Sequence, residues 1–343
     1  MAVQIEFRKS CVPASAEQCI RFAEELERLG YSGFWYPHAV SRQMPILETL
    51  SVLTAVAART SRIRIGTAVL QTPLYQPFAL AQTLMTIDHF SNGRLVCGLG
   101  LGWVPSEFEN LGVPFKERGG RTDEALEIIR RLWTEDEVTF AGKYYTLREA
   151  RLIPKPIQRP YPKILIGGGY NAGARGYPGE KPRPRWVEAP LRRTAKYADG
   201  WVAPPYLSPD EAVEAIGEGL DRIKALGREM GRTITDEEFE IVVETAPFNV
   251  SESRERAVEE AARLHSARSV GDFHQVMGNL SFERQLNTGG FGPPEEVAAF
   301  VDKWLDVARR APALKSIQLN IGSLDPLEQI RRFHEQVRPL LRI

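Results

Sequence analysis

The feature that most constrains the fold of this 343-residue chain is a regular alternation of short apolar segments with longer amphipathic ones. Short runs rich in apolar and β-branched residues predict strands, and there are eight of them: 3–8, 33–38, 63–71, 94–102, 163–169, 200–205, 239–249 and 316–322. Elsewhere apolar residues recur every three or four positions, which predicts helices over 15–29, 47–59, 77–90, 120–133, 191–199, 209–230, 254–266, 294–310 and 325–341. Eight strands and their helical returns in one order predict a closed (β/α)8 TIM barrel rather than an open sheet, with residues 1–343 in one domain.

Two stretches interrupt this alternation. Residues 134–162 end in IPKPIQRPYP, and the four prolines of this ending predict a hairpin and an extended segment, inserted after the fourth strand, rather than a helix. Residues 170–190, which follow the fifth strand, are rich in glycine, proline and arginine and predict a long loop.

Charge and cysteine usage argue against several classes of function. Lysine plus arginine number 44 and aspartate plus glutamate 44, so the chain has no net charge to attract nucleic acid or an anionic membrane. Cys11, Cys19 and Cys97 show no C-x-x-C spacing, which argues against a zinc site or a disulfide framework and fits a reducing cytoplasm. The chain has no run of about 18 apolar residues and no apolar secretory signal, so we expect a cytoplasmic protein.

The active site of a (β/α)8 barrel is built at the C-terminal ends of its strands. The candidate residues there are Cys11, Tyr36, His38, Gln71, Thr72, Trp103, Tyr170, Tyr206, Asn249, Asn320, Gly322 and two glycine clusters. Gly167–Gly169 lies between a strand and a helix, where its N–H groups suit a phosphate; a tight turn without a ligand is the alternative. Gly98-Leu-Gly100-Leu-Gly102 lacks the dinucleotide spacing G-x-G-x-x-G and suits the wall of a planar ring; close packing of the fourth strand is the alternative.

Among the five histidines, His38 is the one placed to act in chemistry. It falls at a predicted strand end beside Tyr36, where an imidazole can donate a hydrogen bond or a proton near neutral pH. The others lie on amphipathic helices, where a structural role is expected, or in a loop: His89, His265, His334 and His274. No H-x-x-x-H, paired-carboxylate or G-x-S-x-G element supports metal-dependent or serine hydrolase chemistry.

Several stretches, taken together and in order, resemble the bacterial luciferase-like family of flavin- and F420-dependent oxidoreductases. They are residues 61–133, which include GRLVCGLGLGW and RGGRTDEALEIIRRLW, followed by VTFAGKYYTL, ILIGGG, KYADGW and DPLEQIRRF. The resemblance implies a (β/α)8 barrel that binds FMN or the deazaflavin F420 at the C-terminal ends of its strands. By the same resemblance a bulge, often with a non-prolyl cis peptide, supports the ring, two glycines lie near the ring and two more hold the phosphate: Ala68–Val69, Gly100, Gly102, Gly168 and Gly169.

The chain departs from some F420-dependent members of this family at two positions. Those members carry Asp-His after the second strand and a glutamate after the glycines of the fourth. This chain has Pro37-His38 and Trp103 there, which ranks FMN ahead of F420 as the cofactor. Residues 170–190 are also longer than the usual family loop, which suggests a lid over the phosphate or the substrate.

The resemblance predicts a monooxygenase that uses reduced FMN and O2 to oxidise a small organic substrate, while the protein positions the ring and excludes water. A separate reductase is expected to supply the reduced cofactor, with His38 and Tyr36 polarising the substrate and Trp103 forming a wall of the pocket. F420-dependent hydride transfer without O2 is the alternative on the same fold. A cofactor-free barrel or partner subunit is the alternative from another class. The resemblance also suggests a homodimer, for which the apolar helix 78–90 is a candidate face; packing of this helix on the barrel is the alternative.

Overall fold

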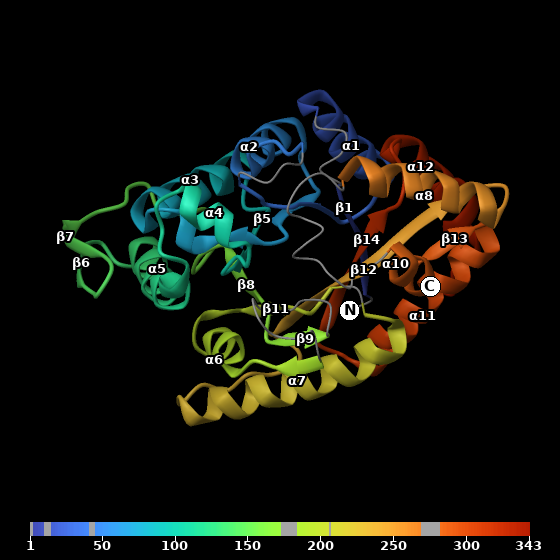
Figure 1. Ribbon diagram of the computed structural model, residues 1–343. Helices are drawn as coiled ribbons and strands as arrows, with labels where there is room; N and C mark the ends of the chain where they lie inside the picture. The colour runs from blue at the N-terminus through green and yellow to red at the C-terminus, as the bar shows by residue number, and fades with distance from the viewer. Residues whose placement is uncertain (1–2, 10–14, 41–44, 173–183, 206, 269–281) are drawn as a thin grey trace.

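The computed structural model describes residues 3–9, 15–40, 45–172, 184–205, 207–268 and 282–343. Its centre is a closed barrel of parallel strands (Figure 1). In order around the barrel the strands are β1 (Gln4–Arg8), β2 (Gly33–Tyr36), β3 (Arg64–Thr67), β5 (Leu95–Gly100), β8 (Lys163–Gly167), β11 (Gly200–Val202), β12 (Glu240–Val250) and β14 (Leu314–Ile321). The pairing of β11 with β12 and of β14 with β1 closes the ring, which confirms the predicted (β/α)8 fold.

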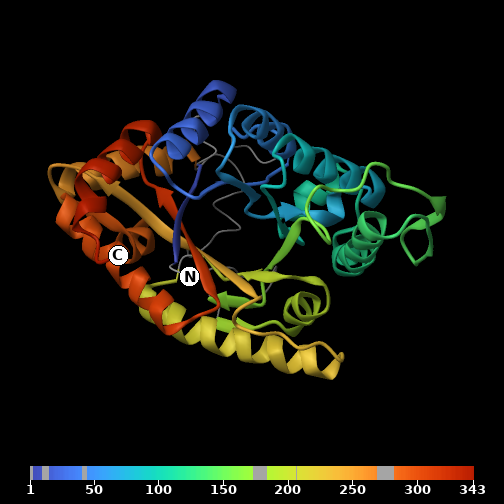
Figure 2. The same cartoon turned by 180° about the vertical axis from the view of Figure 1, so that it is seen from behind.

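Helices cover the outside of the barrel, as the two opposite views in Figures 1 and 2 show. They are α1 (Ala16–Arg28), α2 (Thr49–Arg59), α3 (Pro77–Phe90), α5 (Arg118–Thr134), α6 (Glu188–Tyr197), α7 (Pro209–Glu229), α8 (Arg254–Arg268), α11 (Pro294–Arg310) and α12 (Pro326–Arg332). Local signals set their boundaries: Ser208 and Glu211 form a capping box at the start of α7. Phe22 on α1 packs edge-on against Phe34 on β2, with ring centroids 6.2 Å apart. The strands are thus covered on both faces, which explains their continuous apolar runs.

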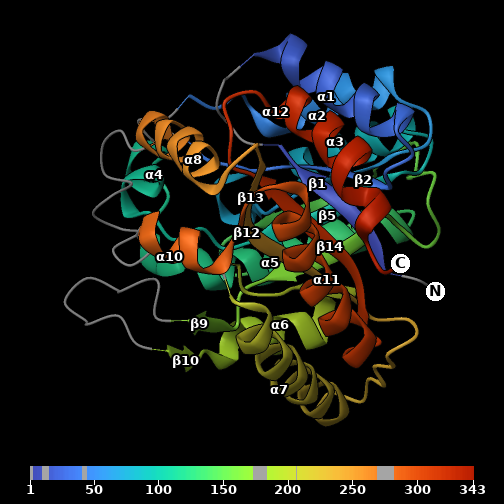
Figure 3. The ribbon, with the colours of Figure 1, turned by 90° about the vertical axis from the view of Figure 1, so that its right-hand side faces the viewer.

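Both predicted interruptions leave a trace in the structure. After α5, strands β6 (Val138–Ala141) and β7 (Thr146–Ala150) form a hairpin that projects from the side of the barrel (Figures 1 and 2). After β8, the short strands β9 (Tyr170–Ala172) and β10 (Pro184–Trp186) pair antiparallel beside α6 and α7 (Figure 3). Residues 173–183, which make up most of the predicted lid, lie outside the described residues.

The structure differs from the predicted elements at several places, one of which is the short helix α4 (Pro105–Asn110) in the segment predicted as a loop after the fourth strand. The third strand is divided, because β4 (Leu70–Gln71) follows a gap after β3 and pairs separately with β5. Between α8 and α11 lie two elements that were not predicted, α10 (Phe282–Thr288) and β13 (Gly290–Gly292). Both are short, and the three residues of β13, Gly-Phe-Gly, carry no periodic signal. The last helix is shorter than predicted, since a π-helical turn and a 3-10 turn follow α12 over Phe333–Val337 and Arg338–Leu340.

The interior of the barrel has two chemically different sides. One side, formed by β2, β3, β5, β8 and β11, is apolar, and its side chains form a single buried cluster that also includes Val242 of β12: Trp35, Ala68, Val96, Leu165, Val202 and Val242. The other side, formed by β12, β14 and β1, carries buried polar side chains: Glu6, Glu240, Glu244, Ser316, Gln318 and Asn320. Trp35 joins the two sides, because its Nε1 donates to Oε2 of Glu6 at 2.7 Å.

Within the described ranges, no helix combines the length and the apolar character needed to cross a bilayer.

Candidate active site at the barrel mouth

The candidate site lies at the mouth of the barrel, meaning the residues at and after the C-terminal ends of the strands. The peptide bond between Ala68 and Val69, in the gap between β3 and β4, is cis, as the resemblance implies for the bulge. The Val69 side chain reaches toward β5 and β8. A Cβ on Gly100 would lie 2.6 Å from Val69 Cγ2, and one on Gly167 would lie 3.2 Å from Val69 Cγ1. Glycine on these two strands therefore leaves room for the bulge.

At Gly98, close packing of strands accounts for glycine by itself. A Cβ there would lie 1.9 Å from the carbonyl oxygen of Thr67 on the neighbouring strand. The Thr67 hydroxyl also donates to the carbonyl oxygen of Gly98 at 2.6 Å. Backbones this close leave no room for a side chain. The alternative of close packing thus holds at Gly98, whereas Gly100 lies beside the bulge.

Gly102 lies over a buried polar cluster that joins the predicted candidate Gln71 to Glu107, which the sequence did not reveal. It has a φ of 75°, and a Cβ there would meet Oε1 of Gln71 at 2.2 Å. The Gln71 side chain donates from Nε2 to Oε1 of Glu107 at 3.2 Å, and the N–H of Val40 donates to the same oxygen at 2.7 Å. Glu107 is fully buried on the short helix α4 (Pro105–Asn110). This carboxylate ties together the segments that follow β2, β4 and β5.

Gly168 and Gly169 form a loop against the start of α6. Their φ values of 113° and 106° belong to a region that residues with a Cβ rarely adopt. Trp201 Nε1 donates to the carbonyl oxygen of Gly168, and the N–H of Val187 donates to that of Gly169, both at 2.7 Å. Val187, the N-cap residue of α6, supplies no side-chain cap. The positive end of this helix therefore lies beside the glycine loop, an arrangement suited to an anion.

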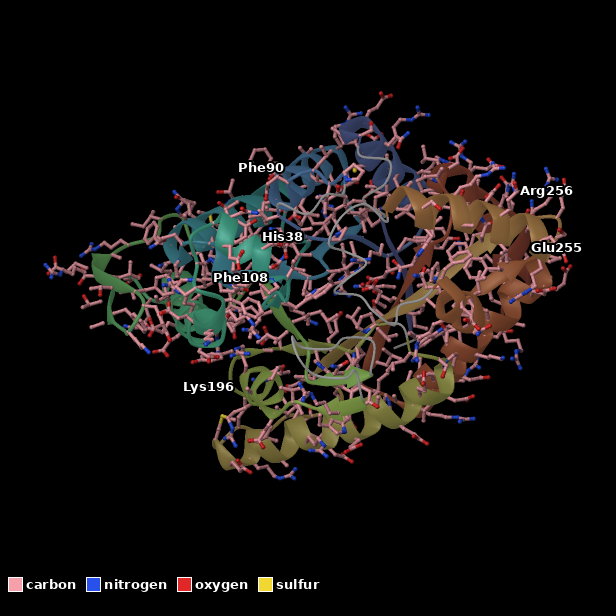
Figure 4. The ribbon with its side chains drawn as sticks, viewed as in Figure 1. His38, Phe90, Phe108, Lys196, Glu255 and Arg256 are labelled. Carbon is pink, nitrogen blue, oxygen red and sulfur yellow. The ribbon has the colours of Figure 1, made fainter. Side chains whose placement is uncertain are left out.

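His38 is buried at the mouth, with 7% of its surface exposed. Its Nε2 lies 2.9 Å from the hydroxyl oxygen of Tyr75, and the Tyr75 hydroxyl donates to Oε1 of Glu48 at 3.3 Å. Glu48 precedes α2 and caps its N-terminus, so the contact joins the end of β2, the segment after β4 and the start of α2. Figure 4 shows His38 in the region between α4 and the barrel strands.

The charge states along this contact follow from its surroundings. Burial alone would raise the pKa of Glu48. Hydrogen bonds from the N–H groups of Leu50 and Ser51 and from the Ser51 hydroxyl, together with nearby His38, outweigh burial and lower this pKa. Burial, and then the nearby charge of Glu48, raise the pKa of Tyr75. At neutral pH Glu48 is therefore a carboxylate and Tyr75 a neutral phenol.

The other two residues predicted to be catalytic lie in different surroundings. The ring of Tyr36 is fully buried and stacks on Phe34, with centroids 6.3 Å apart, in the layer between β2 and α1. Because successive residues of a strand point to opposite faces, Trp35 enters the barrel and Tyr36 does not. Trp103 follows Gly102 in the loop before α4, and its side chain is half-buried. We therefore carry Trp103, but not Tyr36, into the functional proposal.

A second polar group lies on the opposite side of the mouth and joins the predicted candidate Asn320 to Arg8 and Glu244, which the sequence did not reveal. Arg8, at the end of β1, pairs with Glu244 of β12, with 2.9 Å between Nη1 and Oε1. Arg8 also donates from Nη2 to the carbonyl oxygen of Ala68 at 3.2 Å. Asn320 of β14 donates to the same Glu244 oxygen at 3.0 Å. Arg8 and Glu244 lie far apart in the sequence, so no local motif indicates their pairing.

The remaining candidates are structural or lie outside the described residues. Asn249 is fully buried; its side chain donates to Glu260 and to the carbonyl oxygen of Gly322, and accepts from Gln329. These contacts hold α8 and α12 against the barrel. Two candidates, Cys11 and Tyr206, lie outside the described residues, as does the loop histidine His274. Among the residues that are described, no three His, Cys, Asp or Glu side chains gather as a metal site.

Comparison with known proteins places this architecture in a family. The model of the luciferase-like monooxygenase family matches residues 4–302. The chain is 29% identical to the F420-dependent glucose-6-phosphate dehydrogenase of Amycolatopsis mediterranei (strain U-32), over 96% of this chain and 97% of that one. It is 26% identical to the FMNH2-dependent dimethylsulfone monooxygenase of Pseudomonas putida, over 86% of this chain and 78% of that one.

Solved structures share the fold over their whole length. A monooxygenase from Streptomyces bottropensis superposes with a TM-score of 0.77 at 23% identity, covering 98% of this chain and 99% of that one. The coenzyme F420-dependent tetrahydromethanopterin reductase of Methanopyrus kandleri superposes with a TM-score of 0.72 at 17% identity, covering 100% of both chains. Since the family model spans most of the chain and the barrel is that of its structural neighbours, the protein belongs to the luciferase-like monooxygenase family.

Proposed function

We propose that this protein is a monooxygenase that uses reduced FMN and O2 to oxidise a small organic substrate. The observation that carries the proposal is an arrangement on the neighbouring strands β5 and β8. Glycines at the end of β5 line a wall beside the bulge at Ala68–Val69. On the neighbouring strand β8, the glycine loop lies at the start of α6, which has no side-chain cap. Membership of the family and the likeness to an FMNH2-dependent relative support the same assignment.

The residues present fit a flat ring that carries a phosphate. Gly100 and Gly102 leave room for the side chains of Val69 and Gln71 to lie against this end of β5, and Val69 offers the ring an apolar contact. Gly168 and Gly169 hold backbone N–H groups next to the positive end of α6, which suits the phosphate. The backbone N–H groups of this loop and the dipole of α6 can bind a phosphate without a dedicated lysine or arginine.

Bound reduced FMN supplies the electrons that activate O2, and the chain supplies binding, orientation and control of protons. The loop at Gly168 binds the phosphate and fixes the ring against the bulge at Ala68–Val69. His38 holds or moves a proton next to the substrate. Trp103 forms a side wall that excludes water from the reacting atoms.

The proposal includes two partners. A separate reductase delivers reduced FMN, because none of the residues given a role above reduces the cofactor. A second copy of the chain covers an apolar face that includes Phe90 at the end of α3, which is 56% exposed (Figure 4). Ile153 and Ile157, 77% and 39% exposed, lie on the extended segment that contacts α3 through His89 and Lys155. Sedimentation equilibrium of the purified chain measures whether it dimerises.

F420-dependent hydride transfer without O2 is the second candidate. It is favoured by one observation, the match to an F420-dependent dehydrogenase over nearly the whole length of both chains. The same ring wall and phosphate loop serve either cofactor, so the mouth does not discriminate by shape alone.

Binding titrations with oxidised FMN and with F420 test the proposal, followed by O2 consumption with reduced FMN and candidate substrates. We expect FMN to bind saturably at one site per chain and O2 uptake to increase with the correct substrate. Small sulfones are the first substrates to test, since the Pseudomonas putida relative is a dimethylsulfone monooxygenase. Binding of F420 without FMN would select the second candidate, and binding of neither would leave a cofactor-free barrel or a partner subunit.

A further inference from the structure

The hydrogen bonds around His38 determine which of its ring nitrogens carries a proton. The three groups are in series: His38 Nε2 is 2.9 Å from the Tyr75 hydroxyl oxygen, which is 3.3 Å from Oε1 of Glu48. At the far end, Glu48 also accepts from the N–H of Leu50 at 3.0 Å and from the N–H and hydroxyl of Ser51, both at 2.7 Å. In each of these contacts the partner donates a hydrogen bond, and the carboxylate oxygens of Glu48 act only as acceptors.

Counting protons along this series leaves one consistent arrangement. A carboxylate cannot donate, so the hydrogen between Tyr75 and Glu48 belongs to the phenol. A neutral phenol has a single hydrogen, so its oxygen can only accept from His38. The imidazole must therefore donate through an Nε2–H group, whether the ring is neutral or charged.

We propose that Tyr75 and Glu48 are positioning residues that hold the proton of His38 on Nε2 and thereby make Nδ1 the ring nitrogen that gains and loses a proton. The protonation of Nε2 follows from the contacts alone, whereas the role of Nδ1 in a reaction rests on the proposed function. In that role neutral His38 takes a proton on Nδ1 and becomes an imidazolium, and it returns the same proton in the reverse step. The Nε2 proton stays on the bond to Tyr75 throughout.

The surroundings also fix the plane of the imidazole. The Thr49 hydroxyl donates to the carbonyl oxygen of Pro37 at 2.8 Å, which anchors the residue before His38 to the start of α2. The rings of His38 and Tyr75 lie 5.6 Å apart with their planes 49° from parallel. Because Glu48 caps α2, the acceptor at the end of the series is part of a rigid element. The ring is thus held at its backbone and at Nε2.

Nuclear magnetic resonance of the intact protein labelled with 15N-histidine tests the proton assignment without any cofactor. Spectra are recorded at about pH 9, well above the ordinary imidazole pKa of about 6.5, so that the ring is neutral. His38→Asn assigns the signals of His38 among the five histidines. We expect a neutral ring protonated on Nε2, with the Nε2 proton protected from exchange with water. A neutral His38 protonated on Nδ1 would overturn the proposal.

Two variants and a matched control identify the source of the effect. Tyr75→Phe should speed exchange of the Nε2 proton by at least about tenfold, because one hydrogen bond is lost. Glu48→Gln keeps an acceptor oxygen but removes the charge, so the Nε2 proton should remain and its chemical shift should move upfield. Tyr161→Phe makes the same chemical change beside Trp133 and should leave the His38 signals unchanged. Unchanged His38 signals in Tyr75→Phe, with thermal unfolding as in the wild type, would refute the proposal.

The role in the reaction is measured separately from the proton assignment. If the proposed function holds, Tyr75→Phe should lower kcat at least about tenfold with little change in KM or in the Kd for FMN, because the variant loses control of the proton and not a binding contact. A kcat equal to that of the wild type would overturn the role of Nδ1 and leave FMN binding untouched. Failure of FMN binding in the wild type would instead refute the proposed function, while the spectra would still report on Nε2.

Discussion

Glycine is required at Gly98 and at Gly168 for different reasons. At Gly98 a Cβ would lie 1.9 Å from a backbone oxygen, so the requirement is space between two strands. At Gly168 the nearest atom to an added Cβ would be Cβ of Pro190 at 3.4 Å, an ordinary contact, so the requirement is the φ of 113°. Substitution at Gly168 therefore alters the direction of the backbone N–H groups without filling any space.

We predict that Gly168→Ala weakens FMN binding. The alanine would strain the backbone by roughly 1–2 kcal/mol and turn the loop away from the phosphate, so the Kd for FMN should rise about tenfold or more. Fluorescence titration measures it. The matched control is Gly231→Ala, where φ is also positive, at 74°, but no atom lies within 4 Å of an added Cβ. Equal Kd values for the wild type and Gly168→Ala would show that the loop does not hold the phosphate.

Single residues also show where the sequence stops being informative. His38 is predicted at a strand end, and the structure places it at the mouth. Tyr36 is predicted beside it, yet its ring packs on Phe34 outside the barrel. On a parallel strand both faces are apolar, so composition does not reveal which of two adjacent residues points inward. Tyr75 and Glu48 carry no local signal at all, because their contact with His38 exists only once three segments have folded together.

At the scale of elements, Arg94 shows how one side chain joins a helix to two strands. It lies just before β5, and its guanidinium donates to carbonyl oxygens at the C-terminal end of α2 and before β3. The acceptors are Ala57 at 3.0 Å, Thr60 at 2.8 Å and Ile63 at 2.7 Å. The carbonyls at the end of a helix have no partner within the helix, so Arg94 takes the place of a C-cap.

Replacing this arginine by methionine should destabilise the whole barrel. Arg94→Met keeps much of the apolar stem but leaves these carbonyls unpaired, so the free energy of unfolding should fall by about 2–4 kcal/mol. Urea denaturation followed by circular dichroism measures the change. Arg263→Met removes an exposed pair with Glu259 on α8 and should cost less than about 1 kcal/mol. A similar loss in both variants would contradict the capping role.

Elements differ in how well the sequence predicts them. The barrel strands and the long helices follow from periodicity, because burial of one helix face and of whole strands repeats eight times along the chain. The short β13 and α10 do not, since each is only a few residues long and is fixed by its neighbours rather than by its own pattern. The division of the third strand at Ala68 is likewise invisible in a run of apolar residues.

At the scale of the whole molecule, one carboxylate spans the N-terminal end of the barrel. Glu240 at the start of β12 pairs with Arg64 of β3 at 2.6 Å and with Lys163 of β8 at 2.9 Å. β3 lies on the far side of the ring from β12, so the first pair crosses the interior. Burial alone would raise the pKa of Glu240, but the charges of Arg64 and Lys163 outweigh it and lower this pKa below 4.5.

We predict that Glu240→Gln destabilises the fold by about 2–4 kcal/mol, since two cations lose their buried partner. A folded pKa below the unfolded value of 4.5 means that the charge of Glu240 stabilises the fold above pH 4.5. This contribution is lost as the pH falls through the lower, folded pKa. The difference in unfolding free energy between wild type and variant should therefore shrink below about pH 4.5. Urea denaturation between about pH 3 and pH 7 measures it.

Glu252→Gln is the control for this experiment. Glu252, just before α8, pairs with Arg256 on the first turn of that helix, and the two side chains are 80% and 66% exposed. Figure 4 shows Arg256 at the surface. Its loss should change the unfolding free energy by less than about 1 kcal/mol. A difference between wild type and Glu240→Gln that does not narrow in acid would refute the assigned role of the buried carboxylate.

The apolar cluster around Trp35 fills the barrel beneath the mouth, and the ions around Glu240 close its other end. Within the described residues, the barrel is therefore packed from below the mouth to its opposite end and does not form a tunnel. A molecule that reacts at the mouth must therefore arrive and depart on that same side of the barrel, in competition with everything else that uses it. Substitutions at the rim should consequently alter the entry of small gases and of larger molecules together, whereas substitutions at the sealed end should alter neither.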